Sequence, residues 1–310
     1  MTPPNRTVVA LPAHGPAVVP VAALPAVRAA VRVHADDSVP DAVVAELGAT
    51  RLTDGRYADD PDGPEVLFTT DPGHRGEPPE RVIGTPGAAL LDSVAVMDRL
   101  RSPGGCPWDA EQTHESLLPY LVEECYELYQ AIEDGDRAAI REELGDVLLQ
   151  VLFHARVAQP GFTVDDVAAD LVAKLVGRHP HVFAGSETVD TAERQEHRWE
   201  ELKRAEKQRE SSVDGVATAQ PAVALAAKLT SRTARAGLPD ELLPTGSGVG
   251  EALFALAARA KLAGVDPEAQ LRTAALRFAA DVRAAESAAR DAGLDPHALD
   301  GPAWLRFWPR

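Results

Sequence analysis

The sequence predicts a mainly α-helical protein with a small α/β segment at its N-terminus. Up to about residue 86, short apolar runs alternate with turn signals and helical patches, which is the pattern of a small α/β unit. Beyond that point, apolar residues recur at helical spacing, and short breaks containing Pro or Gly separate the helical segments. A linker at residues 211–220 divides the helical part in two, so we expect domains at residues 1–86, 87–210 and 221–310.

The N-terminal segment has four runs that are typical of strands. They are residues 7–11, 30–34, 65–70 and 81–84, and helical patches at residues 21–28 and 41–47 lie between them. Each run is short and rich in β-branched or other apolar residues, which favours strands. The segment contains no GxGxxG or GxxxxGK pattern, so it predicts no phosphate-binding loop of either kind.

The central and C-terminal parts are predicted to be helical. Apolar spacing predicts central helices at residues 88–102, 114–133, 137–159, 164–177 and 191–210. The breaks between them contain Pro-Gly-Gly, Asp-Gly-Asp, Pro-Gly and His-Pro-His, which end helices or form turns. Residues 221–294 are again helical in pattern and rich in Ala, and an aromatic tail follows at residues 304–308.

The composition narrows the possible function classes. The chain has 48 acidic and 31 Lys or Arg side chains and a formal net charge of −17, which disfavours binding along a nucleic acid polymer. Two cysteines, Cys106 and Cys125, cannot form a disulfide framework, and this fits a reducing compartment. No uninterrupted apolar run reaches the ~18 residues of a membrane span. We expect a cytoplasmic protein that binds neither a nucleic acid polymer nor a membrane.

Two acidic motifs stand on consecutive predicted helices. Glu123, Glu124 and Glu127 lie within one helical turn, so they share one broad helix face. Glu143 and Asp146 are three residues apart on the next helix. A short turn joins the two helices, which predicts an antiparallel hairpin in which the five carboxylates face one another.

Five carboxylates at close range raise one another's pKa unless cations lie between them. Mg²⁺ fits such a site, because it prefers oxygen ligands and keeps waters that a phosphate can displace; one or two ions could bind. The alternative is that these acids are only the solvent-exposed side of amphipathic helices, but the fifteen residues between Glu127 and Glu143 place two complete motifs on adjacent helices. Gly145 inside the second motif also favours a site, because Gly costs a helix interior roughly 1 kcal/mol and suggests a close backbone approach.

Further motifs occur in a fixed order around the acidic residues. They are Cys106-Pro107-Trp108-Asp109, Gln112-Thr113-His114, residues 174–183 and Trp199-Glu200-Glu201-Leu202-Lys203. With the acidic motifs, they make residues 88–210 closely similar to MazG, a family of nucleoside triphosphate pyrophosphohydrolases in the all-α NTP pyrophosphatase superfamily. The resemblance implies a helical-bundle catalytic domain, nucleoside triphosphate substrates and a homodimer.

The resemblance also implies roles for individual residues. The acids that would bind Mg²⁺ are Glu123, Glu124, Glu127, Glu143 and Asp146. Lys174 and Arg178 match a basic pair of the family and, four residues apart on one helix face, can meet a triphosphate. Trp199 and Lys203 match residues at the nucleotide end of the family's site, where a Trp can stack on a base. A basic residue that the family places about one turn before the second acidic motif is Ala139 here.

The C-terminal region, residues 221–310, resembles a second MazG-like domain that has lost its catalytic residues. Gly248-Val249-Gly250-Glu251 stands where the second acidic motif would be, and residues 228–243 contain no first motif. The N-terminal segment resembles a remnant of the tetrapyrrole-methylase-like domain that is fused to some MazG proteins.

These features predict Mg²⁺-dependent hydrolysis of nucleoside triphosphates to nucleoside monophosphate and pyrophosphate, in house-cleaning of non-standard or damaged nucleotides. Two alternatives stay open. One is a nucleotide-binding or scaffold protein with little turnover. The other is a dUTP or phosphoribosyl-ATP pyrophosphatase of the same superfamily.

Overall fold

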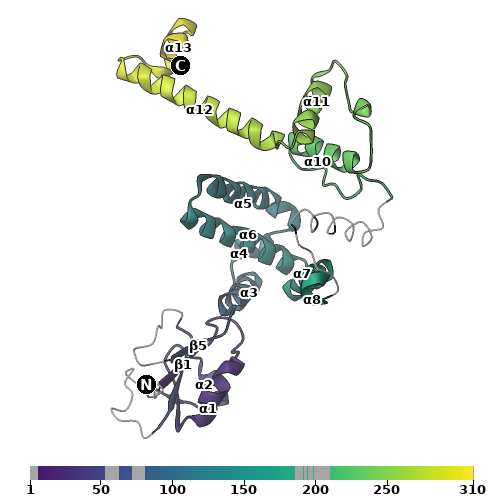
Figure 1. The fold of residues 1–310 in the computed structure, drawn as a ribbon. Helices are drawn as coiled ribbons and strands as arrows, with labels where there is room; N and C mark the ends of the chain where they lie inside the picture. The colour runs from purple at the N-terminus through teal and green to yellow at the C-terminus, as the bar shows by residue number, and fades with distance from the viewer. Residues whose placement is uncertain are drawn as a thin grey trace. The chain divides into compact units, whose positions relative to one another are not determined.

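The computed structural model describes residues 6–52, 63–71, 81–185, 191, 194, 198 and 210–309. The chain divides into two compact units, Met1–His179 and Pro180–Arg310, and Figure 1 shows the helices and strands of each. The described residues are mainly helical, with a small parallel sheet near the N-terminus, which confirms the predicted fold class. The domain boundaries at residues 86 and 210 stay predictions.

The sheet of the first unit has five parallel strands in the order β3-β2-β4-β1-β5. The strands are β1 (Arg6–Ala10), β2 (Arg32–Ala35), β3 (Thr50–Arg51), β4 (Glu65–Thr69) and β5 (Arg81–Gly84). Helices α1 (Leu24–Ala29) and α2 (Asp41–Leu47) and the 3-10 turn Val21–Ala23 contribute side chains to the core on this sheet. All five residues of β4 are buried, as expected for a central strand of a parallel sheet.

Glu65 is a charged residue in this buried strand, and its neighbours explain how it is tolerated. Parallel register places Arg6 of β1 and Arg32 of β2 on either side of it. Their guanidinium groups lie 3.5 Å and 3.2 Å from the Glu65 carboxylate. The carboxylate is therefore paired with two positive charges, which a buried acid requires.

The helical part of the first unit begins with α3 (Ala88–Arg101) and α4 (Pro107–Glu111). It continues with α5 (His114–Asp134), α6 (Arg137–Val157) and α7 (Val164–Arg178). Helices α5 and α6 lie side by side along their lengths (Figure 1). Their core side chains at one end of the hairpin are Leu117, Leu152 and Phe153, which pack with Met97 of α3.

Asp92 of α3 contacts the loop that follows β1. Its carboxylate accepts hydrogen bonds from the backbone N–H groups of Ala13, His14 and Gly15, at 3.0, 2.6 and 2.7 Å. Burial alone would raise the pKa of Asp92, but these donors outweigh it and the pKa is lowered. The contact links the sheet to the first helix of the helical part.

The second unit consists of α8 (Pro180–Phe183), α10 (Ala222–Arg235), α11 (Val249–Leu262), α12 (Pro267–Asp291) and α13 (Gly301–Phe307). Two short 3-10 turns, Asp240–Leu242 and Pro296–Ala298, connect some of these helices. The side chains buried in α10, α11 and α12 are mostly Ala, and such small residues let helices approach closely. The helix predicted at residues 191–210 lies almost wholly outside the described residues.

Among the helices that the structure describes, none is long and apolar enough to cross a membrane.

Candidate active site

The candidate site depends on a tight reversal between α5 and α6. Helix α5 ends at Gly135, which adopts the left-handed conformation with φ 69°, and its N–H bonds back to the last turn of the helix. Asp136 then begins α6, because its carboxylate accepts hydrogen bonds from the N–H groups of Ala138 and Ala139. Only these two residues separate the helices, so the hairpin is antiparallel and its polar faces can meet.

Three of the five predicted acids meet across the hairpin. One carboxylate oxygen from each of Glu124, Glu127 and Glu143 lies within 4.8 Å of the others. The remaining two predicted acids, Glu123 and Asp146, lie close enough for their charges to act on Glu124. We call these five residues the carboxylate cluster; their role as metal ligands stays a prediction.

The acids of the carboxylate cluster raise one another's pKa. Burial first, and then the charges of Asp146, Glu127, Glu123 and Glu143, raise the pKa of Glu124. Desolvation, followed by the charges of Glu127, Asp146 and Glu142, raises the pKa of Glu143. A cation between the helices would relieve this repulsion. The donor set fits Mg²⁺, because it offers several carboxylate oxygens on a partly exposed surface where the ion can keep waters.

Lower pH is expected to stabilise the metal-free protein through Glu124 and Glu143. Their pKa values are raised in the folded state, so the folded state binds more protons just above the ordinary Glu pKa, and the free energy of unfolding rises as the pH falls through this range. We compare wild type with a Glu124→Gln/Glu143→Gln variant, which lacks both titrating groups. As the pH falls from about 8 to about 5, the unfolding free energy of wild type should increase relative to that of the variant. Urea unfolding in EDTA measures it. A difference that stays constant or moves the other way contradicts the electrostatic account.

The predicted basic residues lie on α7, which packs against α6. Lys174 is exposed, whereas Arg178 is 7% exposed at the end of the helix. Their role at the phosphate end of the site stays a prediction. Trp199 and Lys203 lie outside the described residues.

Gly145 of α6 has no close neighbour among the described residues. A Cβ built at Gly145 would meet no described atom within 4 Å, so no packing of the described chain against α6 explains this glycine. A close approach of another group to Gly145 at the site stays a prediction.

One polar residue of the hairpin was not singled out from the sequence. Gln150 of α6 is 3% exposed, and its Oε1 has no hydrogen-bond partner among the described residues. Its spacing of four residues from Asp146 could have identified it, but it lies in an apolar stretch and burial cannot be read from that spacing.

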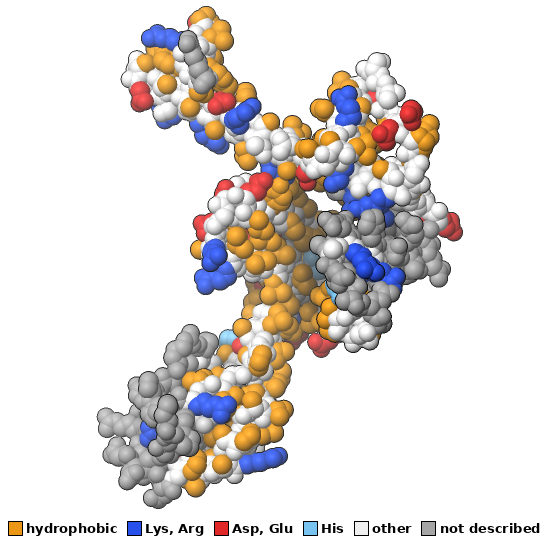
Figure 2. All heavy atoms as spheres, in the orientation of Figure 1, with side chains coloured by type: hydrophobic (Ala, Val, Ile, Leu, Met, Phe, Trp, Pro, Cys, Tyr) orange, Lys and Arg blue, Asp and Glu red, His pale blue; other side chains and the backbone are white. Residues whose placement is uncertain are grey.

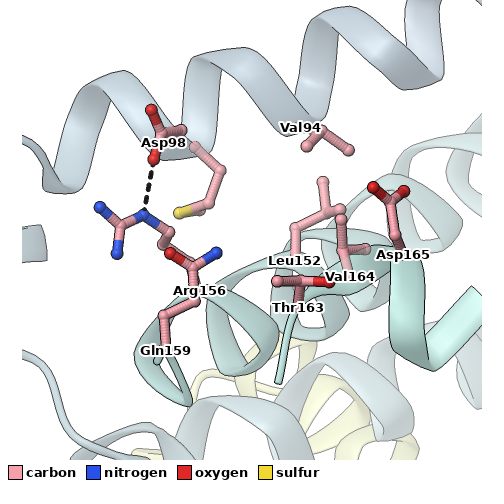
Figure 3. Close-up of a pocket in the computed structure, with 9 residues that line it drawn as sticks. Val94, Asp98, Leu152, Arg156, Gln159, Thr163, Val164 and Asp165 are labelled. Atoms are coloured by element: carbon pink, nitrogen blue, oxygen red, sulfur yellow. Dashed lines mark hydrogen bonds and ion pairs between the residues drawn. The ribbon is translucent and has the colours of Figure 1, made fainter. Parts of the chain in front are cut away.

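A cavity of about 220 Å³ lies between α3, the end of α6 and the start of α7. Figure 3 shows Asp98 and Arg156 at this cavity, joined by an ion pair of 2.8 Å. Val94, Leu152 and Val164 form its apolar side. Among the predicted site residues that the structure describes, none lines this cavity.

Two segments of the chain match known protein families. Residues 112–183 match the MazG nucleotide pyrophosphohydrolase domain, and residues 6–78 match the MazG N-terminal domain. The first match contains the whole carboxylate cluster together with Lys174 and Arg178. The second lies within the predicted segment 1–86.

The chain is similar to two mycobacterial proteins over most of its length. It is 44% identical to a nucleoside triphosphate pyrophosphohydrolase of Mycolicibacterium smegmatis, over 83% of this chain and 84% of the relative. It is 41% identical to a protein of the same name from Mycobacterium tuberculosis, over 95% of this chain and 92% of the relative. A solved structure of a mazG-related protein from Thermotoga maritima has 32% sequence identity and a TM-score of 0.31, and the match covers 35% of this chain and 96% of that one.

Proposed function

Because the chain belongs to the MazG family of nucleoside triphosphate pyrophosphohydrolases, we propose that its carboxylate cluster binds Mg²⁺ and hydrolyses nucleoside triphosphates to nucleoside monophosphate and pyrophosphate. The observation that carries this proposal is the meeting of Glu124, Glu127 and Glu143 within 4.8 Å on a solvent-accessible side of the hairpin. The raised pKa values of Glu124 and Glu143 support it, since they report negative charge that a cation would balance.

In this proposal, the acidic residues bind the metal, and the basic and aromatic residues bind the nucleotide. The carboxylate cluster holds the metal and orients the water that attacks the phosphate chain. The chemistry supplied by bound Mg²⁺ is neutralisation of phosphate charge and a lower pKa of a bound water. Arg178 and Lys174 offset the remaining negative charge as the bond breaks, the Arg as a fork and the Lys as a point charge. From the family resemblance we assign Trp199 and Lys203, which lie outside the described residues, to the nucleotide end of the site, where a Trp side chain can stack on a base.

Mg²⁺ is expected to raise the melting temperature of the wild-type protein. A ligand present at ten times its dissociation constant stabilises the folded state by about 1.4 kcal/mol, which corresponds to roughly 3–5 °C for a unit of this size. Differential scanning fluorimetry with MgCl₂, against NaCl of equal ionic strength, measures the shift. The Glu124→Gln variant should lose most of it, whereas Glu133→Gln, an exposed acid further along α5, should keep it. Equal shifts in both variants would show that the cluster does not bind the ion.

We further propose that the physiological substrates are non-standard or damaged nucleotides. A panel of standard, oxidised and base-methylated triphosphates, together with dUTP and phosphoribosyl-ATP, ranks them by kcat/KM. The proposal requires kcat/KM for at least one damaged nucleotide to be about tenfold higher than kcat/KM for the undamaged parent nucleotide. A tenfold ratio corresponds to about 1.4 kcal/mol of discrimination. If dUTP or phosphoribosyl-ATP has the highest kcat/KM, the house-cleaning proposal is wrong and the chain is a pyrophosphatase for that substrate.

An apolar stripe on α5 supports a homodimer. Exposed apolar side chains recur at helical spacing on the side of α5 away from the carboxylate cluster, and they include Leu118, Val122 and Ile132. Figure 2 shows hydrophobic side chains gathered on the visible face of the α5–α6 hairpin. Size-exclusion chromatography with light scattering should give twice the mass of 32.9 kDa, and Val122→Glu should shift it towards the monomer. We assign the C-terminal region to packing or dimerisation, since it lacks both acidic motifs.

A further inference from the structure

Two histidines contact each other across the α5–α6 hairpin, at the end away from the turn. His114 is the first residue of α5 and His154 lies in the last turn of α6. Their Nδ1 atoms are 2.8 Å apart, the ring planes are 5° from parallel and the ring centroids are 5.1 Å apart. The centroid separation exceeds the nitrogen separation by about two ring radii. The rings therefore lie edge to edge in nearly one plane, with Nδ1 facing Nδ1.

This contact, the histidine pair, needs one proton between the two nitrogens. One Nδ1–H donates, and the other Nδ1 accepts through its lone pair. A singly charged pair keeps the bond, because an imidazolium N–H donates to the neutral ring in a charge-assisted hydrogen bond. When both rings are charged, each Nδ1 carries a hydrogen and no acceptor is left. The histidine pair is therefore compatible with no charge or one charge, and incompatible with two.

The surroundings decide which ring carries the first charge. His114 is exposed, whereas His154 is half-buried and its Nε2 is buried without a hydrogen-bond partner among the described residues. Burial, followed by the charge of His114, lowers the pKa of His154. A charge on His154 would leave a buried charged donor unsatisfied, which costs more than a neutral one. The first charge therefore belongs to His114, and His154 is the acceptor whose protonation breaks the bond.

Other ionisable groups lie on the helices at this end of the hairpin. They are Asp98 and Arg101 on α3, Asp109 and Glu111 on α4, Glu115 on α5, Arg156 on α6, and Asp165 and Asp166 on α7. Asp98 binds Arg156 at 2.8 Å. The charges of Glu115 and His114 attract each other, which favours the first charge on His114. The charge that acts on His154 is that of His114, so the pair responds to its own protonation.

The histidine pair lies beside the core that joins the two helices. Leu117 is one turn after His114, and Phe153 directly precedes His154. Both apolar side chains are buried in the same cluster, together with Leu152. Separation of the two rings therefore removes a polar contact between the helices at the edge of this core.

We propose that the histidine pair is a pH-sensitive contact that joins the start of α5 to the end of α6 and opens when both rings are charged. At neutral pH the bond is intact. In acid the two charged rings repel each other, and this end of the hairpin opens. The inference concerns the fold and does not depend on the reaction proposed for the carboxylate cluster.

NMR of the imidazole groups tests the order of protonation. Full-length protein labelled with ¹⁵N-histidine is titrated from about pH 8 to about pH 4.5, and His114→Asn and His154→Asn assign the two rings. We expect His154 to become charged at a pH lower by about half a unit or more in wild type than in His114→Asn, because asparagine carries no charge. An unchanged titration of His154 in His114→Asn would contradict the proposal.

Amide hydrogen exchange tests the opening of the hairpin. In His154→Asn, Oδ1 takes the place of Nδ1 and accepts from His114 whether or not that ring is charged. Because the pKa of His154 is lowered in the folded state, wild type loses stability as the pH falls below the ordinary His pKa. We expect residues 114–124 and 148–157 to exchange about tenfold faster in wild type than in His154→Asn at about pH 5, and equally at about pH 7.5. Both proteins keep Glu124 and Glu143, so the titration of these acids cancels in the comparison.

Three further variants make the result specific. His297→Asn is the same change at an exposed histidine of the second unit, and its exchange should match wild type at both pH values. His154→Phe keeps a ring but removes the acceptor, so exchange in the two segments should be faster already at about pH 7.5. If His154→Asn does not fold, His114→Asn replaces it, because an amide can donate to neutral His154 or accept from the charged ring. An equal response to pH in wild type and the Asn variant would overturn the proposal.

Discussion

Replacing Glu127 by glutamine is expected to lower kcat/KM for triphosphate hydrolysis by about 100-fold or more. Glu127 is one of the three acids whose oxygens lie within 4.8 Å of one another, and Gln keeps its shape while removing the negative charge. A metal at a phosphate is worth several kcal/mol of transition-state stabilisation, and each 1.36 kcal/mol is a factor of ten in rate. Steady-state release of pyrophosphate at saturating Mg²⁺ measures the loss.

The control for this change is Glu133→Gln. Glu133 is an exposed acid on the same helix outside the carboxylate cluster, so its replacement changes the net charge equally. We expect its kcat/KM to stay within about twofold of wild type, as for most surface substitutions. Similar activity in wild type and Glu127→Gln would exclude Glu127 from the catalytic centre.

Replacing Leu117 by alanine is expected to lower the free energy of unfolding by about 2–5 kcal/mol. Leu117 is 1% exposed and packs with Met97, Leu152 and Phe153 at the end of the hairpin. Alanine removes three carbons from this core and leaves a cavity that the neighbouring helices fill only in part. Urea unfolding followed by circular dichroism, with EDTA present, measures the change.

Leu90→Ala provides the matched comparison in the same unit. Leu90 lies on α3 and is exposed, so removing the same atoms should change the unfolding free energy by less than about 0.5 kcal/mol. An equal loss in both variants, or no loss in Leu117→Ala, would contradict the assignment of Leu117 to the core that supports the hairpin.

The hairpin could be predicted from the sequence because its signals are local. Apolar periodicity defines α5 and α6, and Asp134-Gly135-Asp136 supplies both the left-handed residue that ends α5 and the cap that starts α6. Once the reversal is this short, acids on facing sides have to approach one another. The structure brings Glu124, Glu127 and Glu143 together by this geometry.

Other features depend on packing and could not be predicted in the same way. Strand β3 (Thr50–Arg51) is too short to have a periodic pattern, and helix α4 (Pro107–Glu111) spans little more than one turn. The order of the strands depends on contacts between distant segments. The open surroundings of Gly145 and the unused oxygen of Gln150 are visible only when side chains are placed against neighbouring helices.

The most direct test of the central claim is product analysis with purified protein and a panel of nucleoside triphosphates, with Mg²⁺ or with EDTA. Ion-exchange chromatography separates monophosphate, diphosphate, pyrophosphate and inorganic phosphate. The account predicts equal amounts of monophosphate and pyrophosphate with Mg²⁺, and neither with EDTA. Diphosphate and inorganic phosphate as the products, or equal rates of hydrolysis with and without metal, would contradict it.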